Sequence, residues 1–134
     1  MNLLLDTHIL LWTLSDDRKL STKARKLIGD KANAKYYSVV SLWETEIKHL
    51  LHPEKMPLDA GTLAGYCERA NMREIPIRNR HVFALGSLKR GENTAPHKDP
   101  FDRIMLCQAM NEDMLFLTND KLLSEYQQTF VILV

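Results

Sequence analysis

Five short apolar runs, each separated from the next by segments with helical signals, constrain the fold of this chain more than any other feature. Strands joined by helical crossovers pair in parallel, and a parallel sheet needs helices on both faces. We therefore predict an α/β fold, a three-layer α/β/α sandwich with a central parallel five-stranded sheet. The predicted strands are Asn2 to Leu5, Tyr36 to Val40, Glu74 to Ile77, Met114 to Leu117 and Phe130 to Val134.

The segments between these runs carry local signals for helix starts. Pro76 favours the sheet edge for the third strand. In the helix predicted after Ser41, four apolar residues form a stripe at the spacing of a core-facing surface: Trp43, Ile47, Leu50 and Leu51. Helices are expected after Asp6-Thr7, over Leu20 to Asp30, from Ser41, from Asp59 to about Ala70, from Asn79 to about Leu88, from Asp99-Pro100 and from Lys121 to about Gln127.

Size and charge narrow the class of protein. The chain has 134 residues, of which 45% are hydrophobic and 26% charged, so residues 1–134 are predicted to form one domain. A net charge of +1 gives no long-range field toward polyanions, so any nucleic-acid site must be a local patch. The sequence shows no secretory signal and no apolar stretch near the roughly 18 residues that span a bilayer, so a cytoplasmic location is expected. Cys67 and Cys107 have no metal-type spacing and are expected to be reduced, buried thiols.

Four acids recur where apolar runs give way to helices: Asp6, Glu44, Asp102 and Asp120. Open α/β sheets bind ligands outside the carboxyl ends of their strands, near the point where the strand order reverses. The four side chains can therefore face one cleft, where carboxylate oxygens suit Mg²⁺ or a similar hard cation.

Each acid also has a purely structural reading. Asp6 and Asp120 are suitable N-caps, and Asp102 lies in the first turn of a helix that Asp99 caps. Glu44 has the spacing of a capping box with Ser41 and also pairs with Lys48 at i, i+4. Four unrelated caps that converge in space are less expected than one metal site, so we favour the metal site.

The segments that contain these acids resemble the PIN-domain ribonucleases, specifically toxins of the VapC type from bacterial toxin–antitoxin pairs. The resemblance rests on Leu4-Leu5-Asp6-Thr7-His8, Ser41-Leu42-Trp43-Glu44, His97-Lys98-Asp99-Pro100-Phe101-Asp102-Arg103 and Leu117-Thr118-Asn119-Asp120, and it spans essentially the whole chain. It implies an endoribonuclease dependent on Mg²⁺ or Mn²⁺, with the acidic quartet on Asp6, Glu44, Asp102 and Asp120. It also implies a homodimer that a small antitoxin protein silences.

The resemblance suggests roles for individual residues. Asp6, Asp102 and Asp120 would hold the ion, and Glu44 would orient or deprotonate the attacking water. Glu46 departs from similar sequences and is expected to point out of the cleft, and Asp99 remains a possible further acid of the site. The predicted substrate-binding residues are Thr7, Lys48, Lys98, Arg103, Thr118 and Lys121, with Lys89-Arg90 as an extension. His8 and His97 lie near the site but are expected to be satisfied or solvent-facing.

Two other functions stay open from the sequence. A phosphotransfer enzyme or receiver domain uses a similar sheet, but Asp6-Thr7-His8 lacks the second acid of an Asp-x-Asp motif. A non-catalytic RNA- or protein-binding domain is the other alternative, although an anionic cleft does not favour a polyanion. For a homodimer we expect exposed apolar surface on the helices between Leu58 and Leu88. The RNA target is not readable from the sequence.

Overall fold

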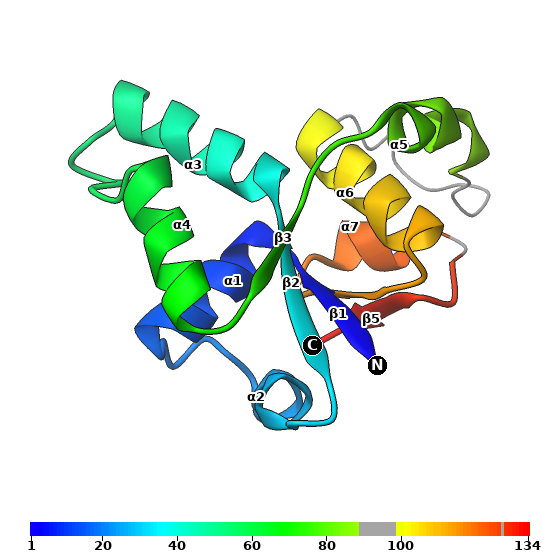
Figure 1. The fold of residues 1–134 in the computed structure, drawn as a ribbon, viewed down its shortest axis with the longest axis horizontal. Coiled ribbons are helices and arrows are strands. Elements are labelled where there is room, and N and C mark those ends of the chain that lie inside the picture. Colours follow the sequence, from blue (N-terminus) through cyan, green and yellow to red (C-terminus); the bar gives the residue numbers. More distant parts are fainter. Residues whose placement is uncertain (89–98, 127) are drawn as a thin grey trace.

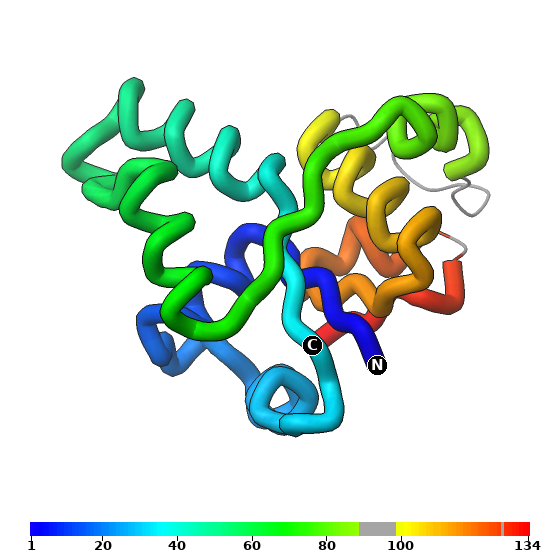
Figure 2. Tube along the Cα trace, viewed as in Figure 1, coloured from blue at the N-terminus to red at the C-terminus, as the bar shows by residue number. Residues whose placement is uncertain are grey.

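The computed structural model describes residues 1–88, 99–126 and 128–134 (Figure 1). The strands are β1 (Asn2–Leu5), β2 (Ala34–Ser38), β3 (Arg73–Ile75), β4 (Leu115–Thr118) and β5 (Val131–Leu133). The helices are α1 (Thr7–Ser15), α2 (Thr22–Gly29), α3 (Val39–Leu51), α4 (Ala60–Arg69), α5 (Asn79–Phe83), the 3₁₀ helix η1 (Ala84–Ser87), α6 (Pro100–Asn111) and α7 (Lys121–Ser124). The Cα trace in Figure 2 shows the sheet running through the middle of the molecule, with helices on either side.

The five strands form one parallel sheet in the order β3-β2-β1-β4-β5, which confirms the predicted fold class. β2 and β3 follow in order on one side of β1, and β4 and β5 follow on the other side. The strand order therefore reverses between β1 and β4. Leu5 pairs with Tyr37 on one side and with Leu117 on the other. The residues that follow these three strands therefore share one edge of the sheet. β3, which leads into Pro76, is an edge strand as predicted.

Two hydrophobic clusters cover the two faces of the sheet. Leu3 and Leu5 belong to one cluster and Leu4 to the other, because successive side chains of a strand point to opposite faces. The first cluster includes side chains of α1, α2 and α4, and the second includes side chains of α6 and α7. Figure 1 shows the same division, with α1, α2 and α4 on one side of the strands and α5, α6 and α7 on the other.

The start of α3 differs from the prediction. The strand was expected to continue to Val40 with Ser41 as the helix cap, but β2 ends at Ser38, whose hydroxyl accepts a hydrogen bond from the Val40 backbone N–H at 3.0 Å. Ser38 therefore caps the helix three residues earlier, and Val39 and Val40 are helical despite their β-branched side chains. Ser41 lies inside the helix, so the predicted capping box with Glu44 is wrong.

Two smaller boundaries also differ. Arg78 is the N-cap of α5, and Asn79, which was expected to cap, is its first residue. The helix expected to reach Leu88 is split into α5 and η1. Elsewhere Asp59 and Asp99, where helices were predicted to start, each accept a hydrogen bond from a backbone N–H of the first helical turn, and Ser21 does the same for α2. These caps are local signals, so they can be read directly from the sequence.

The stripe predicted to bury one face of α3 is largely in solvent. The exposed fraction is 56% for Trp43, 71% for Leu50 and 68% for Leu51. The helix packs through Val40, Ser41 and Thr45 instead. The 3.6-residue period was identified correctly, but the periodicity alone did not show which apolar face is covered.

Two further predictions concern the thiols and the membrane. Cys67 and Cys107 are free and buried, as expected, and burial raises the pKa of each thiol to about 11. Within the described ranges no helix combines the length and hydropathy needed to cross a bilayer.

Candidate metal-binding active site

The site begins where β1 and β4 end side by side. Asp6 follows β1 directly and is the N-cap of α1, and Asp120 lies two residues beyond β4 and is the N-cap of α7. The Asp6 backbone N–H donates to the Leu117 carbonyl at 3.0 Å, which continues the parallel pairing to the last residue of the strand edge. The two acids are therefore fixed by adjacent strands at the reversal point, where this class of sheet binds ligands.

Asp6 is a buried carboxylate held at both oxygens. Its Oδ1 accepts from the Thr7 backbone N–H at 2.6 Å, and its Oδ2 accepts from the Thr118 hydroxyl at 2.6 Å. Burial raises the pKa of Asp6, whereas the hydrogen bonds from Thr118 and Thr7 act to lower it. The capping role and the site role are thus combined in one side chain. The same Thr118 hydroxyl accepts from the Asp120 backbone N–H at 3.1 Å, so one threonine orders both acids.

Glu44 reaches the same edge from the second turn of α3. Its Oε1 accepts from the Thr7 hydroxyl at 2.8 Å, and its Oε2 lies 3.3 Å from the Lys48 Nζ. Because the single Thr7 hydroxyl proton goes to Glu44, the Ser41 hydroxyl is the donor in its 2.9 Å contact with Thr7. A chain from Ser41 through Thr7 therefore fixes the orientation of the Glu44 carboxylate. Ser41 was singled out in the sequence, but as a cap.

Asp102, in the first turn of α6, completes the group. Burial is the largest cause that raises its pKa to about 8, and the charges of Asp6, Asp99, Glu44 and Asp120 add to the effect. The other three predicted acids of the site therefore lie close enough for their charges to raise the pKa of Asp102. Asp99 accepts from the backbone N–H groups of Phe101 and Asp102 at 2.9 and 3.3 Å, so its cap role is confirmed while its charge also faces Asp102.

The donor set fits a hard, hydrated divalent cation. All four side chains offer carboxylate oxygens, and they concentrate negative charge in a partly buried site. Within residues 1–88, 99–126 and 128–134, no three His, Cys, Asp or Glu side chains lie close enough to enclose an ion by themselves. The four side chains supply oxygen ligands, which suit Mg²⁺ or Mn²⁺, and Mg²⁺ is usually bound by one or two carboxylates together with waters and substrate phosphates.

The predicted substrate contacts divide into three groups. Lys48 lies 3.3 Å from Glu44, and Lys121 follows Asp120 directly in the chain, so the contact of both with a phosphate stays a prediction. Arg103 turns away, because its Nη2 approaches the Leu85 carbonyl at 3.5 Å and its buried Nε has no hydrogen-bond partner among the described residues. Lys98, Lys89, Arg90 and His97 lie outside the described residues.

Thr7 and Thr118 are nearly inaccessible to solvent, at 3% and 0% exposed. Their hydroxyls are directed at Glu44 and Asp6, so we assign both residues to the positioning of the acids. Glu46 points out of the cleft as predicted, since its Oε1 accepts from the Ala60 backbone N–H at 3.0 Å and caps α4. His8 is exposed and stacks on Trp12, with ring centroids 5.7 Å apart.

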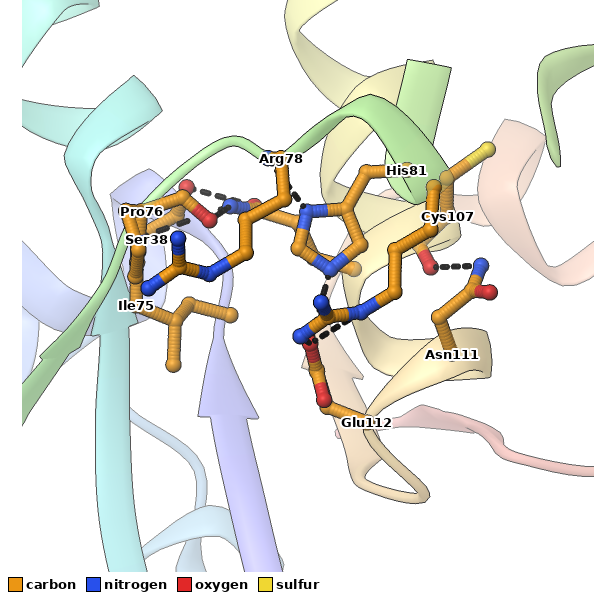
Figure 3. A network of polar contacts seen from close by, with 10 residues as sticks. Ser38, Ile75, Pro76, Arg78, His81, Cys107, Asn111 and Glu112 are labelled. Carbon is orange, nitrogen blue, oxygen red and sulfur yellow. Dashed lines mark hydrogen bonds and ion pairs between the residues drawn. The ribbon is translucent and has the colours of Figure 1, made fainter. Parts of the chain in front are cut away.

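A second polar network lies beside the site and was not predicted (Figure 3). The buried Gln108 side chain accepts from the Ser38 hydroxyl at 2.5 Å and donates to the Pro76 carbonyl at 3.1 Å, which ties α6 to the ends of β2 and β3. His81 Nδ1 accepts from the Arg78 backbone N–H at 2.9 Å, so its Nε2 is the donor to Glu112 Oε1, also at 2.9 Å. Apart from Arg78 and His81, which are three residues apart, these partners are about 30 to 70 residues apart in the chain, so no local sequence signal marks their contacts.

Comparison with known proteins gives the family. The model of the PIN domain family matches residues 3–128. A solved structure of VapBC2 from Rickettsia felis, bound to a DNA fragment from the promoter, matches with a TM-score of 0.68 and 16% identity over 100% of this chain and 98% of that chain. No protein with curated annotation matches the sequence. Membership of this family supports a nuclease type of activity and the general use of divalent metals. The family match over nearly the whole chain, on a sheet of the matching topology, shows that the chain belongs to the PIN-domain family.

Proposed function

We propose that this protein is a divalent-metal-dependent endoribonuclease and the toxin of a VapC-type toxin–antitoxin pair. The observation that carries the proposal is the convergence of Asp6, Glu44, Asp102 and Asp120 from four separate elements. Asp6, Asp99, Glu44 and Asp120 lie close enough to Asp102 for their charges to raise its pKa, in addition to the larger effect of burial. A fold does not gain stability from such a group of like charges, so a bound cation is the simplest reason for it.

Each acid has a distinct role in the proposed reaction. Asp6, Asp102 and Asp120 hold Mg²⁺ or Mn²⁺, directly or through water. When bound, the ion supplies an activated water and offsets negative charge on the phosphate. Glu44 orients the attacking water and accepts its proton, and the Thr7 hydrogen bond keeps the Glu44 carboxylate turned toward the site. In-line attack by water then leaves a 5′-phosphate and a 3′-hydroxyl.

The protein surface supports binding partners of two kinds. An open, mostly apolar hollow of about 470 Å³ lies between α1 and α4, with Leu11, Trp12, Met56, Leu58 and Tyr66 among the residues that line it. Its lining is suited to an apolar protein segment, and we propose the antitoxin as its occupant. Val82 and Phe83 of α5 are also exposed and lie in the region where we expected the surface of a homodimer. We place the protein in the cytoplasm, where its RNA substrate is present.

Cleavage of RNA by the purified protein tests the activity. We expect cleavage with Mg²⁺ or Mn²⁺, none with excess chelator, and at least about a 100-fold loss in Asp6→Asn, since removal of one charge-stabilising group costs roughly that much. Asn keeps a side-chain acceptor at the N-cap of α1, so the fold should be retained. Sequencing of the RNA ends after brief expression of both forms would identify the target.

Binding of the metal should also be visible without activity. A ligand that binds only the folded state stabilises it by about 2.7 kcal/mol at 100 times its Kd, so millimolar Mn²⁺ should raise the melting temperature of the wild type. A non-catalytic RNA-binding domain would instead bind RNA without metal and leave its ends intact. That result, or a melting temperature indifferent to Mn²⁺, would contradict the proposal.

A further inference from the structure

Trp43 and Phe101 form an aromatic pair at the edge of the acidic site. Their rings meet edge to face, with centroids 4.9 Å apart and an interplanar angle of 88°. Trp43 precedes Glu44 on α3, and Phe101 precedes Asp102 on α6. The pair therefore joins the two helices that carry half of the acidic quartet, at the positions adjacent to those acids.

The two rings are held very differently. Phe101 is partly buried and packs against the hydrophobic cluster of α6. Trp43 is 56% exposed, and its ring contacts the Phe101 ring. The result is a large apolar residue that Phe101 contacts and that keeps more than half of its surface open to solvent.

We propose that the exposed Trp43 ring, supported by Phe101, stacks on an unpaired nucleobase of the RNA next to the phosphate that is cleaved. This inference rests on the proposed ribonuclease activity and adds a residue that positions the substrate beside the cleaved phosphate. Trp43 is the residue directly before Glu44, and its ring lies against Phe101, the residue directly before Asp102. The ring therefore lies beside two of the acids, and we place the base that neighbours the cleaved phosphate against it.

The charges around the ring favour a base over other occupants. Glu44 and Asp102 follow the two rings directly, and acidic side chains disfavour a second phosphate but accept a neutral base. Lys48, one turn beyond Glu44 and 46% exposed at its side chain, is placed for the phosphate on the other side of that base. Bases in a duplex are already stacked and their edges lie in a narrow groove, so only an unpaired base can stack on a protein ring.

Fluorescence provides a direct binding test. The chain has two tryptophans, so Trp12→Phe leaves Trp43 as the only one, and Asp6→Asn in the same protein prevents cleavage. A single-stranded oligoribonucleotide that contains the cleavage site should quench Trp43, and the same sequence annealed to its complement should not. Equal quenching by both, or none by either, would overturn the inference.

Kinetics separate a base contact from a structural role. Stacking on one aromatic ring is worth roughly a tenfold effect on binding, so Trp43→Ala should lower kcat/KM on single-stranded RNA about tenfold, chiefly through KM, while Trp43→Phe stays near the wild type. Leu50→Ala removes another exposed apolar side chain of α3 and is the matched control, expected to behave as the wild type.

Substrates that lack the neighbouring base allow the loss of the ring and the loss of the base to be compared singly and together. An abasic site beside the scissile phosphate should lower wild-type cleavage about tenfold and should have no further effect on Trp43→Ala. Additive losses would show that Trp43 does not touch that base. Wild-type cleavage with an unaffected Trp43→Ala variant would overturn this inference and leave the nuclease proposal standing, whereas a wild type that cleaves nothing would overturn both. Loss of self-association in Trp43→Ala, with cleavage unchanged, would identify a second copy of the chain as the occupant.

Discussion

Two polar regions lie at the two ends of α6. One brings like charges close together, and the other pairs opposite charges. At the first turn of α6, Asp102 faces other acids and its pKa rises to about 8. At the other end of the helix, Glu112 accepts hydrogen bonds from Arg80 and His81, and its pKa is lowered. The first region concentrates like charge and the second neutralises it, within one helix of twelve residues.

This difference leads us to expect that the neutralised region serves stability and that the acidic region serves function. A neutralised network, in which Gln108, Ser38 and His81 all have partners, joins α5 and α6 to the strand ends and costs the fold no unpaired buried group (Figure 3). The acidic region should raise the free energy of the folded chain, and the cation of the proposed function would offset that cost. We therefore expect mutations in the two regions to have separable effects, and the following predictions test that separation in order of decreasing effect.

The largest effect should come from removal of the charge at either end of α6. Asp102→Asn should lower metal-dependent cleavage at least about 100-fold and leave the melting temperature unchanged or higher, because a repelled carboxyl is lost. Glu112→Gln should do the reverse, with cleavage retained and about 1–2 kcal/mol of unfolding free energy lost. Denaturant unfolding and RNA cleavage on both variants are the measurements. A loss of both properties in each variant would show that the two regions act as one.

The caps of the acidic region were predictable from the sequence, and the reason is local. Asp6 and Asp120 are caps next to strand ends, and Asp99 caps the helix that carries Asp102, so a few neighbouring residues identify both the secondary structure and the position of the charge. The parallel sheet then brings them together because all strand ends of one sense share an edge.

The neutralised region was not predictable, because its signals are not local. Nothing near Gln108 indicates Ser38 or Pro76 as a partner, and His81 reads as an ordinary helix residue until Glu112 is placed beside it. The misplaced start of α3 has a similar cause, since Ser38 and Ser41 are both acceptable caps and tertiary packing selects the first. Only the assembled fold decides which of two equal local signals is used.

The second largest effect should follow from replacing Gln108, the central polar side chain of the neutralised network, by an apolar one. Gln108→Met keeps the size of the side chain but leaves the Ser38 hydroxyl and the Pro76 carbonyl without these partners, and about 2 kcal/mol of stability should be lost. Asn111→Ala, which breaks a 2.8 Å bond to the Cys107 carbonyl within the same helix, is the control and should cost about 0.5 kcal/mol or less. Similar losses for the two variants would count against a special role for the network.

The pH dependence of stability should have opposite signs in the two regions. The folded pKa of Asp102 is raised from 3.8 to about 8, so without metal the folded state holds a proton that the unfolded state releases, and stability should fall as pH rises between these values. After allowance for solvent screening we expect a decline of about 1–2 kcal/mol. Glu112 has a lowered pKa, so its contribution is present above its usual 4.5 and is lost as pH falls through its folded value.

Unfolding in denaturant from about pH 2 to pH 9, with chelator present, would measure both the decline toward high pH and the loss toward low pH. Asp102→Asn should flatten the decline toward high pH, and Glu112→Gln should reduce the loss toward low pH. Added Mn²⁺ should also flatten the decline toward high pH, because the cation replaces the proton. A decline that persists unchanged in Asp102→Asn would place its origin in another group.

The smallest effect is expected at an acid that lies close to the site in sequence but serves neither region. Glu46 is two residues from Glu44, yet its carboxylate accepts from the Ala60 backbone N–H, so Glu46→Ala should cost about 0.5–1 kcal/mol as the loss of a helix cap. Glu46→Gln retains the acceptor and should be close to neutral, and both variants should cleave RNA at the wild-type rate with the same Mn²⁺ dependence. A change in metal dependence in Glu46→Gln would mean that proximity to the cleft, rather than the direction of the side chain, determines which acids serve the site.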